Sequence, residues 1–161
     1  MLDAAIVGGG LAGAALALTL ARAGVKVALV ERQSPEALGA EETDGRTTAL
    51  AAGARALMED IEPHAGEITD IRVTDRDSTL KVHFDHNDVG GQPMGHIVEN
   101  FHLRRALLDA IAAKPRIEAY WNCTLSSFEG DAAGAQLLLE GGQVLDARLA
   151  MVPSRRRRMF I

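Results

Sequence analysis

The first thirty or so residues combine two short apolar runs with one long alanine- and leucine-rich segment. Residues 4–7 (AAIV) are apolar and predict a short buried strand, and the segment from 11 to 23 has no β-branched run and predicts a helix. Gly24 is expected to end this helix in a left-handed conformation. Residues 25–31 (VKVALVE) predict a second strand. Together these segments predict a βαβ unit of about 30 residues, with parallel strands and a right-handed crossover.

The pattern becomes irregular after the second strand. Residues 33–45 are rich in Gly, Glu and Pro and predict an irregular stretch, and residues 47–61 carry leucine and isoleucine at helical spacing and predict a second helix. Apolar and polar residues alternate in 68–75 and again in 79–85, which predicts a hairpin. Residues 86–95 are turn-forming and predict a loop.

The last third of the chain predicts one helix followed by strands. Residues 101–113 form the helical segment, with Asn100 placed to cap it. Beyond residue 116, strand-like segments are separated by GDAAG (130–134) and EGG (140–142), which predict hairpin turns. The expected fold class is α/β, a Rossmann-like βαβ unit with an inserted hairpin and meander.

The composition excludes several functional classes. The chain is 47% hydrophobic and 24% charged, in the range of globular domains, and its formal net charge is −5. Four of the basic residues are the consecutive arginines 155–158, so the remainder is acidic and no nucleic-acid partner is expected. The single cysteine, Cys123, favours a reducing compartment. No basic leader precedes Asp3, and the apolar run 11–21 is shorter than the ~20 residues of a membrane span, so we expect a cytoplasmic protein without a transmembrane segment.

Polar and aromatic residues outside the first strands give little sign of catalysis. The five histidines lack the spacing of metal ligands, so no metal site is expected; they are His64, His83, His86, His96 and His102. Tyr120 and Trp121 are expected to lie in the core or on a sheet face. No nucleophile, base and orienting acid can be assembled, so no catalytic residue is predicted.

A GxGxxG pattern lies between the first strand and the first helix. Gly8 permits a tight turn, Gly10 leaves room for a pyrophosphate to approach the backbone, and Gly13 lets the helix pack close to the sheet. The N–H groups around Leu11 and Ala12, at the positive end of the helix dipole, would face the phosphates. The pattern predicts a dinucleotide site; the alternative is that these small residues only pack the helix against the sheet.

Glu31 follows the second strand, 23 positions after Gly8. A carboxylate there can accept hydrogen bonds from both ribose hydroxyls, and its charge repels a 2′-phosphate. FAD or NAD therefore fits better than NADP. The glycine pattern occurs in flavin and in nicotinamide enzymes, so it does not choose between them.

Three segments carry a resemblance that distinguishes a flavin enzyme from a nicotinamide enzyme. They are 3–32 (DAAIVGGGLAGAALALTLARAGVKVALVER), 45–58 (GRTTALAAGARALM) and 94–111 (MGHIVENFHLRRALLDAI). With them the chain resembles, over roughly residues 3–150, the FAD-dependent aromatic hydroxylases of the p-hydroxybenzoate hydroxylase type, and among these the 2-octaprenyl-phenol hydroxylases of ubiquinone biosynthesis. The resemblance implies FAD as the cofactor, NAD(P)H as the electron donor, and a phenolic or prenylated quinone precursor as the substrate.

The resemblance also assigns roles to four charged residues. It implies that Glu31 holds the adenosine ribose, that Arg32 borders the adenine, and that Arg46 and Arg104 lie beside the bound FAD. An arginine suits such places because it stays charged and offers a planar fork of donors. From the residues alone, the favoured interpretation is that Arg46 is a surface residue at the start of a helix and that Arg104 is a solvated helix residue.

The chain departs from the family at its end. The family's Asp-Gly and Gly-Asp flavin motifs are absent, and residues 144–152 (VLDARLAMV) are followed by PSRRRRMFI. We therefore expect residues 1–152 to be the N-terminal portion of an FAD-binding domain, incomplete and truncated relative to the family, and 153–161 to be an aberrant basic tail. A short internal deletion is expected near residue 61.

This incompleteness has functional consequences. Apolar faces are expected to be exposed, and the chain alone is expected to be inactive in hydroxylation, because oxygen transfer requires a site that excludes water. Two further interpretations stay open: a stand-alone NAD-binding Rossmann oxidoreductase domain, and a non-enzymatic truncated remnant that binds a partner through exposed sheet edges. The NAD-binding interpretation is weakened by the hairpin and meander, which interrupt the βαβ alternation.

Overall fold

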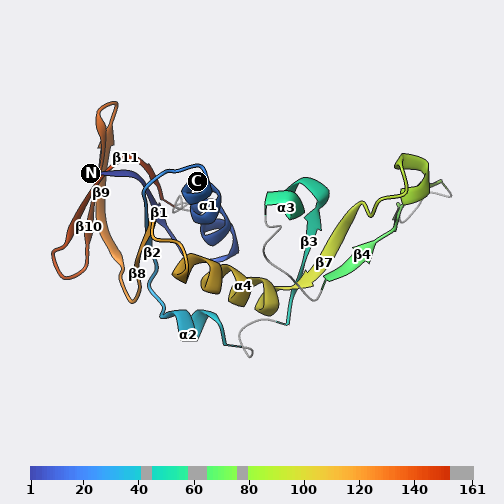
Figure 1. Cartoon of the computed structure of the whole chain (residues 1–161), viewed down its shortest axis with the longest axis horizontal. Helices are drawn as coiled ribbons and strands as arrows, with labels where there is room; N and C mark the ends of the chain where they lie inside the picture. The colour runs from blue at the N-terminus through green and yellow to red at the C-terminus, as the bar shows by residue number, and fades with distance from the viewer. Residues whose placement is uncertain (41–44, 58–64, 76–79, 153–161) are drawn as a thin grey trace, which may run out of the picture. The chain divides into compact units, whose positions relative to one another are not determined.

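A computed structural model describes residues 1–40, 45–57, 65–75 and 80–152 of the chain (Figure 1). The chain forms two compact units, one made of Met1–Ala40 with Leu107–Ile161 and the other of Glu41–Ala106. The boundary between them falls within helix α4 (Asn100–Ala112).

The first unit contains a six-stranded sheet in the order β8-β2-β1-β11-β10-β9. Its strands are β1 (Leu2–Val7), β2 (Val27–Val30), β8 (Ile117–Tyr120), β9 (Leu125–Asp131), β10 (Gly134–Leu139) and β11 (Val144–Met151). Strand β1 pairs in parallel with both β2 and β11, and β2 pairs in parallel with β8. Strands β9, β10 and β11 form an antiparallel meander, which confirms the strands and hairpin turns predicted after residue 116.

The βαβ unit predicted from the first thirty residues is confirmed. Helix α1 (Leu11–Arg22) connects β1 to β2, and Gly24 follows it with a φ of +89°. The helix buries one stripe made of three alanines and a leucine: Ala14, Ala17, Leu18 and Ala21. This spacing of three and four residues places them on a single face, which packs on the sheet.

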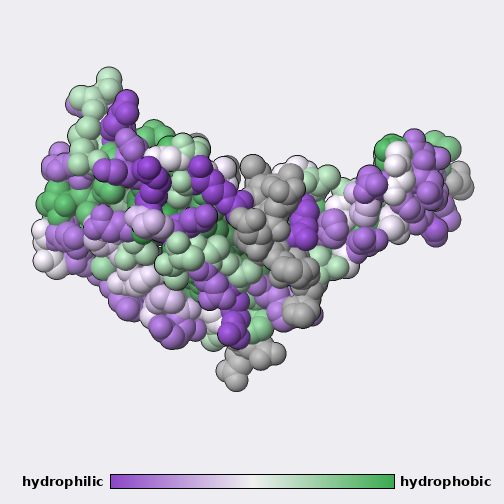
Figure 2. Space-filling model, in the orientation of Figure 1, coloured by the Kyte–Doolittle hydropathy of each residue, from purple (hydrophilic) through white to green (hydrophobic). Residues whose placement is uncertain are grey.

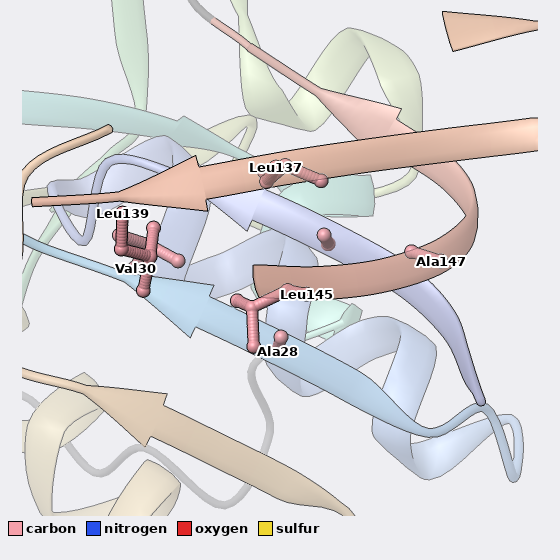
Figure 3. Close-up of a cluster of buried hydrophobic side chains, with 7 residues drawn as sticks. Ala28, Val30, Leu137, Leu139, Leu145 and Ala147 are labelled. Carbon is pink, nitrogen blue, oxygen red and sulfur yellow. The ribbon is translucent and has the colours of Figure 1, made fainter. Parts of the chain in front are cut away.

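The meander supplies the apolar side chains that pack against the strands of the βαβ unit. Leu137, Leu139, Leu145 and Ala147 form a buried cluster with Ala5, Ala28 and Val30 (Figure 3). Leu137 and Leu139 are almost fully buried, and each such side chain contributes about 1.5–3 kcal/mol to folding. This packing fixes the ends of β1 and β2, where the glycine pattern and Glu31 lie.

The second unit contains two small antiparallel sheets. One has the order β3-β7-β4, and the other pairs β5 with β6. The elements of this unit are β3 (Thr47–Ala51), α3 (Ala52–Leu57), β4 (Ala65–Ile68), β5 (Asp70–Thr74), β6 (Lys81–Asp85), a 3-10 helix η2 (His86–Val89) and β7 (Gly95–Glu99). The hairpin predicted over 68–75 and 79–85 is confirmed by β5 and β6, while residues 76–79 lie outside the described part of the chain.

Other predictions for the middle of the chain are wrong in part. The helix expected over 47–61 begins as strand β3, because its residues pair with β7 from Thr47↔Glu99 to Ala51↔Gly95, and this pairing overrides the local alanine-rich propensity. Only Ala52–Leu57 is helical, and residues 58–64, with the expected deletion, lie outside the described part. The loop expected over 86–95 contains η2 and ends where β7 begins. The irregular stretch 33–45 contains a short helix, α2 (Pro35–Leu38), whose N-cap Ser34 accepts a hydrogen bond from the Ala37 N–H at 3.1 Å.

The surface of the meander carries exposed apolar side chains. Figure 2 shows hydrophobic patches among the hydrophilic surface over β9 and β10. Phe128, Val144, Leu149 and Met151 are each about half exposed. Among the described residues, no helix is both long enough and apolar enough to cross a membrane. The tail 153–161 lies outside the described residues.

Candidate dinucleotide-binding site

The glycine turn links the end of β1 to the start of α1. Gly8 has a φ of +109°, a conformation that favours glycine, and its N–H donates to the Val30 carbonyl at 2.8 Å. A Cβ atom on Gly13 would lie 1.9 Å from the Gly8 carbonyl oxygen. The turn and the helix therefore approach each other so closely that position 13 has no room for a side chain.

The start of helix α1 is open and has no side-chain cap. A Cβ atom on Gly10 would meet no atom within 4 Å. Gly10 is the N-cap of the helix, no side chain caps it, and the first turn beginning at Leu11 and Ala12 has no acidic residue. Backbone N–H groups at such a helix start favour an anion, so this part of the site fits the pyrophosphate of a dinucleotide.

Glu31 is held beside the glycine turn by two backbone donors. The residue is only 8% exposed; its Oε2 accepts a hydrogen bond from the Gly9 N–H at 2.6 Å, and its Oε1 accepts one from the Gln33 N–H at 3.0 Å. A carboxylate has about four acceptor positions, so each oxygen keeps capacity for a further donor. The carboxylate can therefore accept the two hydroxyls of a ribose while its own position stays fixed.

A cavity of about 650 Å³ opens beside this carboxylate. Its lining residues are Val7, Gly8, Val30, Glu31, Arg32, Val152 and the segment 123–128. The volume lies in the range of small-molecule sites. Arg32 is exposed and lines this cavity next to Glu31, and its place beside an adenine stays a prediction.

Arg46 and Arg104 lie in the second unit, whereas the glycine turn and Glu31 lie in the first. Arg46 is exposed and precedes strand β3, so the prediction that it starts a helix is wrong. Its carbonyl accepts a hydrogen bond from the Asn100 N–H at 2.9 Å. Arg104 is only 8% exposed, so the interpretation as a solvated helix residue is also wrong. Thr48 donates its hydroxyl to the Asn100 Oδ1 at 2.5 Å, which ties β3 to the start of α4.

Three residues at the site were not predicted from the sequence. Gly9 and Gln33 hold the Glu31 carboxylate, and Trp121 lies against Gly9. Gly9 could have been noticed as the middle glycine of GGG, but the backbone donor at Gln33 has no side-chain signal. Trp121 comes from the turn after β8, and only the pairing of β8 with β2 brings it to the site.

Two further groups of polar side chains have shifted pKa values. On the hairpin, Asp70, His83 and Asp85 bring ligand-type atoms within 4.8 Å of one another, so the cross-strand register assembles a cluster that the sequence spacing did not predict. A hydrogen bond with His83 lowers the pKa of Asp70, and hydrogen bonds from Asn87 lower that of Asp85. In the first unit, burial and a hydrogen bond to Glu118 raise the pKa of Tyr120 to about 12.

The family can be assigned by comparison with known proteins. Residues 3–152 match the FAD dependent oxidoreductase family. The chain belongs to this family. Its cofactor is FAD, as the resemblance implied. Among curated relatives, the ubiquinone hydroxylase UbiL of Rhodospirillum rubrum is 37% identical over 96% of this chain, and the 3-demethoxyubiquinol 3-hydroxylase of Escherichia coli is 31% identical over 92%. The chain spans only 37% and 40% of the lengths of these two relatives.

Solved structures confirm the fold. The p-nitrophenol 4-monooxygenase PnpA from Pseudomonas putida superposes with a TM-score of 0.70 at 20% identity, covering 93% of this chain and 40% of PnpA. PqsL of Pseudomonas aeruginosa, in complex with 2-aminobenzoylacetate, gives a TM-score of 0.69 at 23% identity, covering 92% of this chain and 41% of PqsL. At these identities the match establishes the α/β, Rossmann-like FAD-binding fold and no more.

Proposed function

We propose that this FAD-dependent oxidoreductase chain is the part that binds the ADP moiety of FAD in a cytoplasmic, NAD(P)H-dependent aromatic monooxygenase of ubiquinone biosynthesis. The observation that carries the proposal is the Glu31 carboxylate, held by the Gly9 and Gln33 N–H groups beside an open glycine turn. The similarity to the ubiquinone hydroxylase of Rhodospirillum rubrum supports a phenolic or prenylated quinone precursor as the substrate.

In this proposal, different residues bind different parts of FAD. Glu31 accepts the ribose hydroxyls, and the N–H groups around Leu11 and Ala12 bind the pyrophosphate, which approaches over Gly10. Gly8 and Gly13 shape the turn, Arg32 borders the adenine, and the side chains of Arg46 and Arg104 supply positive charge beside the flavin. When bound, FAD supplies the electron-transfer and oxygen chemistry of the reaction.

We further propose that the 161 residues by themselves do not hydroxylate a substrate. They span about 37% of the UbiL chain, and apolar side chains such as Phe128 and Leu149 are exposed on the meander. Oxygen transfer depends on a site closed to water, and in this proposal the rest of a longer flavoenzyme would supply that closure. An oxygenated product that requires both NAD(P)H and substrate, detected with the purified chain, would overturn this proposal.

The nucleotide specificity can be tested by calorimetric titration of the purified chain with FAD, ADP and NADH. We expect FAD and ADP to bind, and Glu31→Gln to weaken both by about tenfold or more, because hydrogen bonds to a charged acceptor contribute about 1.5–3 kcal/mol each. Glu129→Gln is the matched control, because this exposed carboxylate in β9 lies outside the cavity. Tight binding of NADH without FAD would instead support an NAD-binding domain, and binding of no nucleotide would support a non-enzymatic remnant.

A further inference from the structure

The turn after strand β8 is bonded to the segment that carries Glu31. The Glu31 N–H donates to the Tyr120 carbonyl at 2.9 Å, and the Glu31 carbonyl accepts from the Cys123 N–H at 3.0 Å. The Asn122 N–H donates to the Gln33 carbonyl at 3.4 Å, and Asn122 has a φ of +56°. This left-handed residue reverses the chain within the turn, so that backbone groups on both sides of Trp121 bond to the 31–33 segment.

Trp121 and Glu31 both lie beside the open side of Gly9. A Cβ atom on Gly9 would lie 3.0 Å from the Glu31 Cβ and 3.4 Å from the Trp121 Cζ3. Gly9 is buried, and its N–H makes the 2.6 Å hydrogen bond to the Glu31 Oε2. The edge of the indole ring therefore lies beside the residue whose N–H fixes the carboxylate.

The neighbours of Trp121 have a different part in the packing. Tyr120 and Cys123 pack against the buried cluster of the sheet and the meander, which includes Val30 and Leu139. Trp121 is half-buried, and its ring lies next to Gly9 of the glycine turn. Loss of its ring therefore removes a contact at the site while the apolar core of the first unit is preserved.

We propose that Trp121 is a positioning residue for the adenosine ribose. Its ring holds Gly9 against Glu31 and so keeps the Glu31 carboxylate in place to accept the 2′- and 3′-hydroxyls. This inference rests on the proposed binding of the ADP moiety at the same site. A preorganised carboxylate binds more tightly because less motion is lost when the ligand arrives.

The experiment compares ADP with 2′-deoxy-ADP, which lacks one ribose hydroxyl. Calorimetry on the full 161-residue chain gives both affinities for the wild type, Trp121→Ala and Trp121→Phe, with Phe84→Ala as the control for loss of an aromatic ring elsewhere. In the wild type, we expect 2′-deoxy-ADP to bind about tenfold more weakly, because one hydrogen bond to a charged group is missing. In Trp121→Ala, we expect this ratio to fall to about twofold and ADP to bind about tenfold more weakly, whereas Trp121→Phe retains most of the discrimination and Phe84→Ala retains all of it.

A purely structural role for Trp121 would lower the amount of folded protein without changing the ratio between the two ligands. A Trp121→Ala variant that keeps the tenfold ratio therefore overturns the proposal. If this variant does not fold by circular dichroism, Trp121→Leu replaces it and is judged by the same ratio. Failure of the wild type to bind ADP would refute the proposed function itself, and the inference with it. Normal ADP binding with an unchanged ratio in the variant would refute the inference alone.

Discussion

Alanine substitutions at Gly13 and Gly10 are expected to separate folding from binding. In Gly13→Ala, the new Cβ would lie 1.9 Å from the Gly8 carbonyl oxygen, whereas real Cβ contacts essentially never fall below 3.0 Å. The helix or the turn must therefore move by about 1 Å, and overpacking of this kind costs up to about 3 kcal/mol when the neighbour is backbone. Alanine recovers about 1 kcal/mol through helix propensity. The net loss is about 2 kcal/mol of unfolding free energy.

The Gly10→Ala variant is expected to lose ADP affinity while its stability changes little. Its Cβ would meet nothing within 4 Å, and the backbone angles of Gly10, φ −65° and ψ −179°, are open to any residue. Alanine is a slightly poorer N-cap than glycine, so we expect a loss of about 0.5 kcal/mol in stability. The methyl group would occupy the space where the pyrophosphate approaches, and a clash of about 1–3 kcal/mol would weaken ADP binding about 5- to 150-fold.

Both properties can be measured on the same samples. Urea unfolding followed by circular dichroism gives the stability, and calorimetry with ADP gives the affinity. A Gly13→Ala variant as stable as the wild type would refute the packing argument. A Gly10→Ala variant with unchanged ADP affinity would show that the pyrophosphate does not pass over this residue.

Three further predictions follow from the packing and the pKa values. Leu137→Ala removes a side chain that is fully buried in the cluster of Figure 3. The free energy of unfolding, measured in urea, should therefore fall by about 2–5 kcal/mol. A smaller loss than in the exposed control Val144→Ala would contradict the assigned core. The pKa of Tyr120 is raised to about 12 in the folded state, against 10.0 for an ordinary tyrosine, so its contribution to stability is complete below pH 10 and is lost as the pH rises towards 12. Urea midpoints against pH should show this loss in the wild type and much less of it in Tyr120→Phe; equal slopes would contradict it. His83→Leu removes the hydrogen bond that holds the pKa of Asp70 below its usual value, so this pKa should rise. NMR titration of the Asp70 carboxyl measures it, and an unchanged pKa would show that another group is the cause.

Local sequence signals predicted the βαβ unit well because each of its elements has its own cause nearby. The helix α1 has a small-residue stripe, Gly24 ends it with a positive φ, and the glycine pattern lies at the turn that it shapes. Glu31 was found because it follows the second strand directly. The burial of Glu31 and its hydrogen bonds from two backbone N–H groups arise only in the folded chain, so the sequence did not predict them.

The middle of the chain was predicted less well because its structure depends on distant partners. Residues 47–51 have an alanine-rich composition that favours a helix, yet they form a strand because β7, almost fifty residues later, supplies the hydrogen-bonding edge. The burial of Arg104 likewise depends on tertiary packing, which its helical position does not encode. Trp121 reaches Gly9 only through the pairing of β8 with β2, so no local pattern could have assigned it to the site.

Strand β11 lies between two partners of opposite direction. Ala147 is in register with Leu2 of the parallel neighbour β1 and with Ala135 of the antiparallel neighbour β10. A shift of β11 by one residue in this register would turn every β11 side chain to the other face, and would displace Val152 at the wall of the cavity. An insertion between β9 and β10 disturbs only the edge of the sheet. Relatives should therefore vary in length mainly at the turn between β9 and β10. The turn between β10 and β11, at residues 140–143, should keep its length because it helps to set the position of the cavity wall.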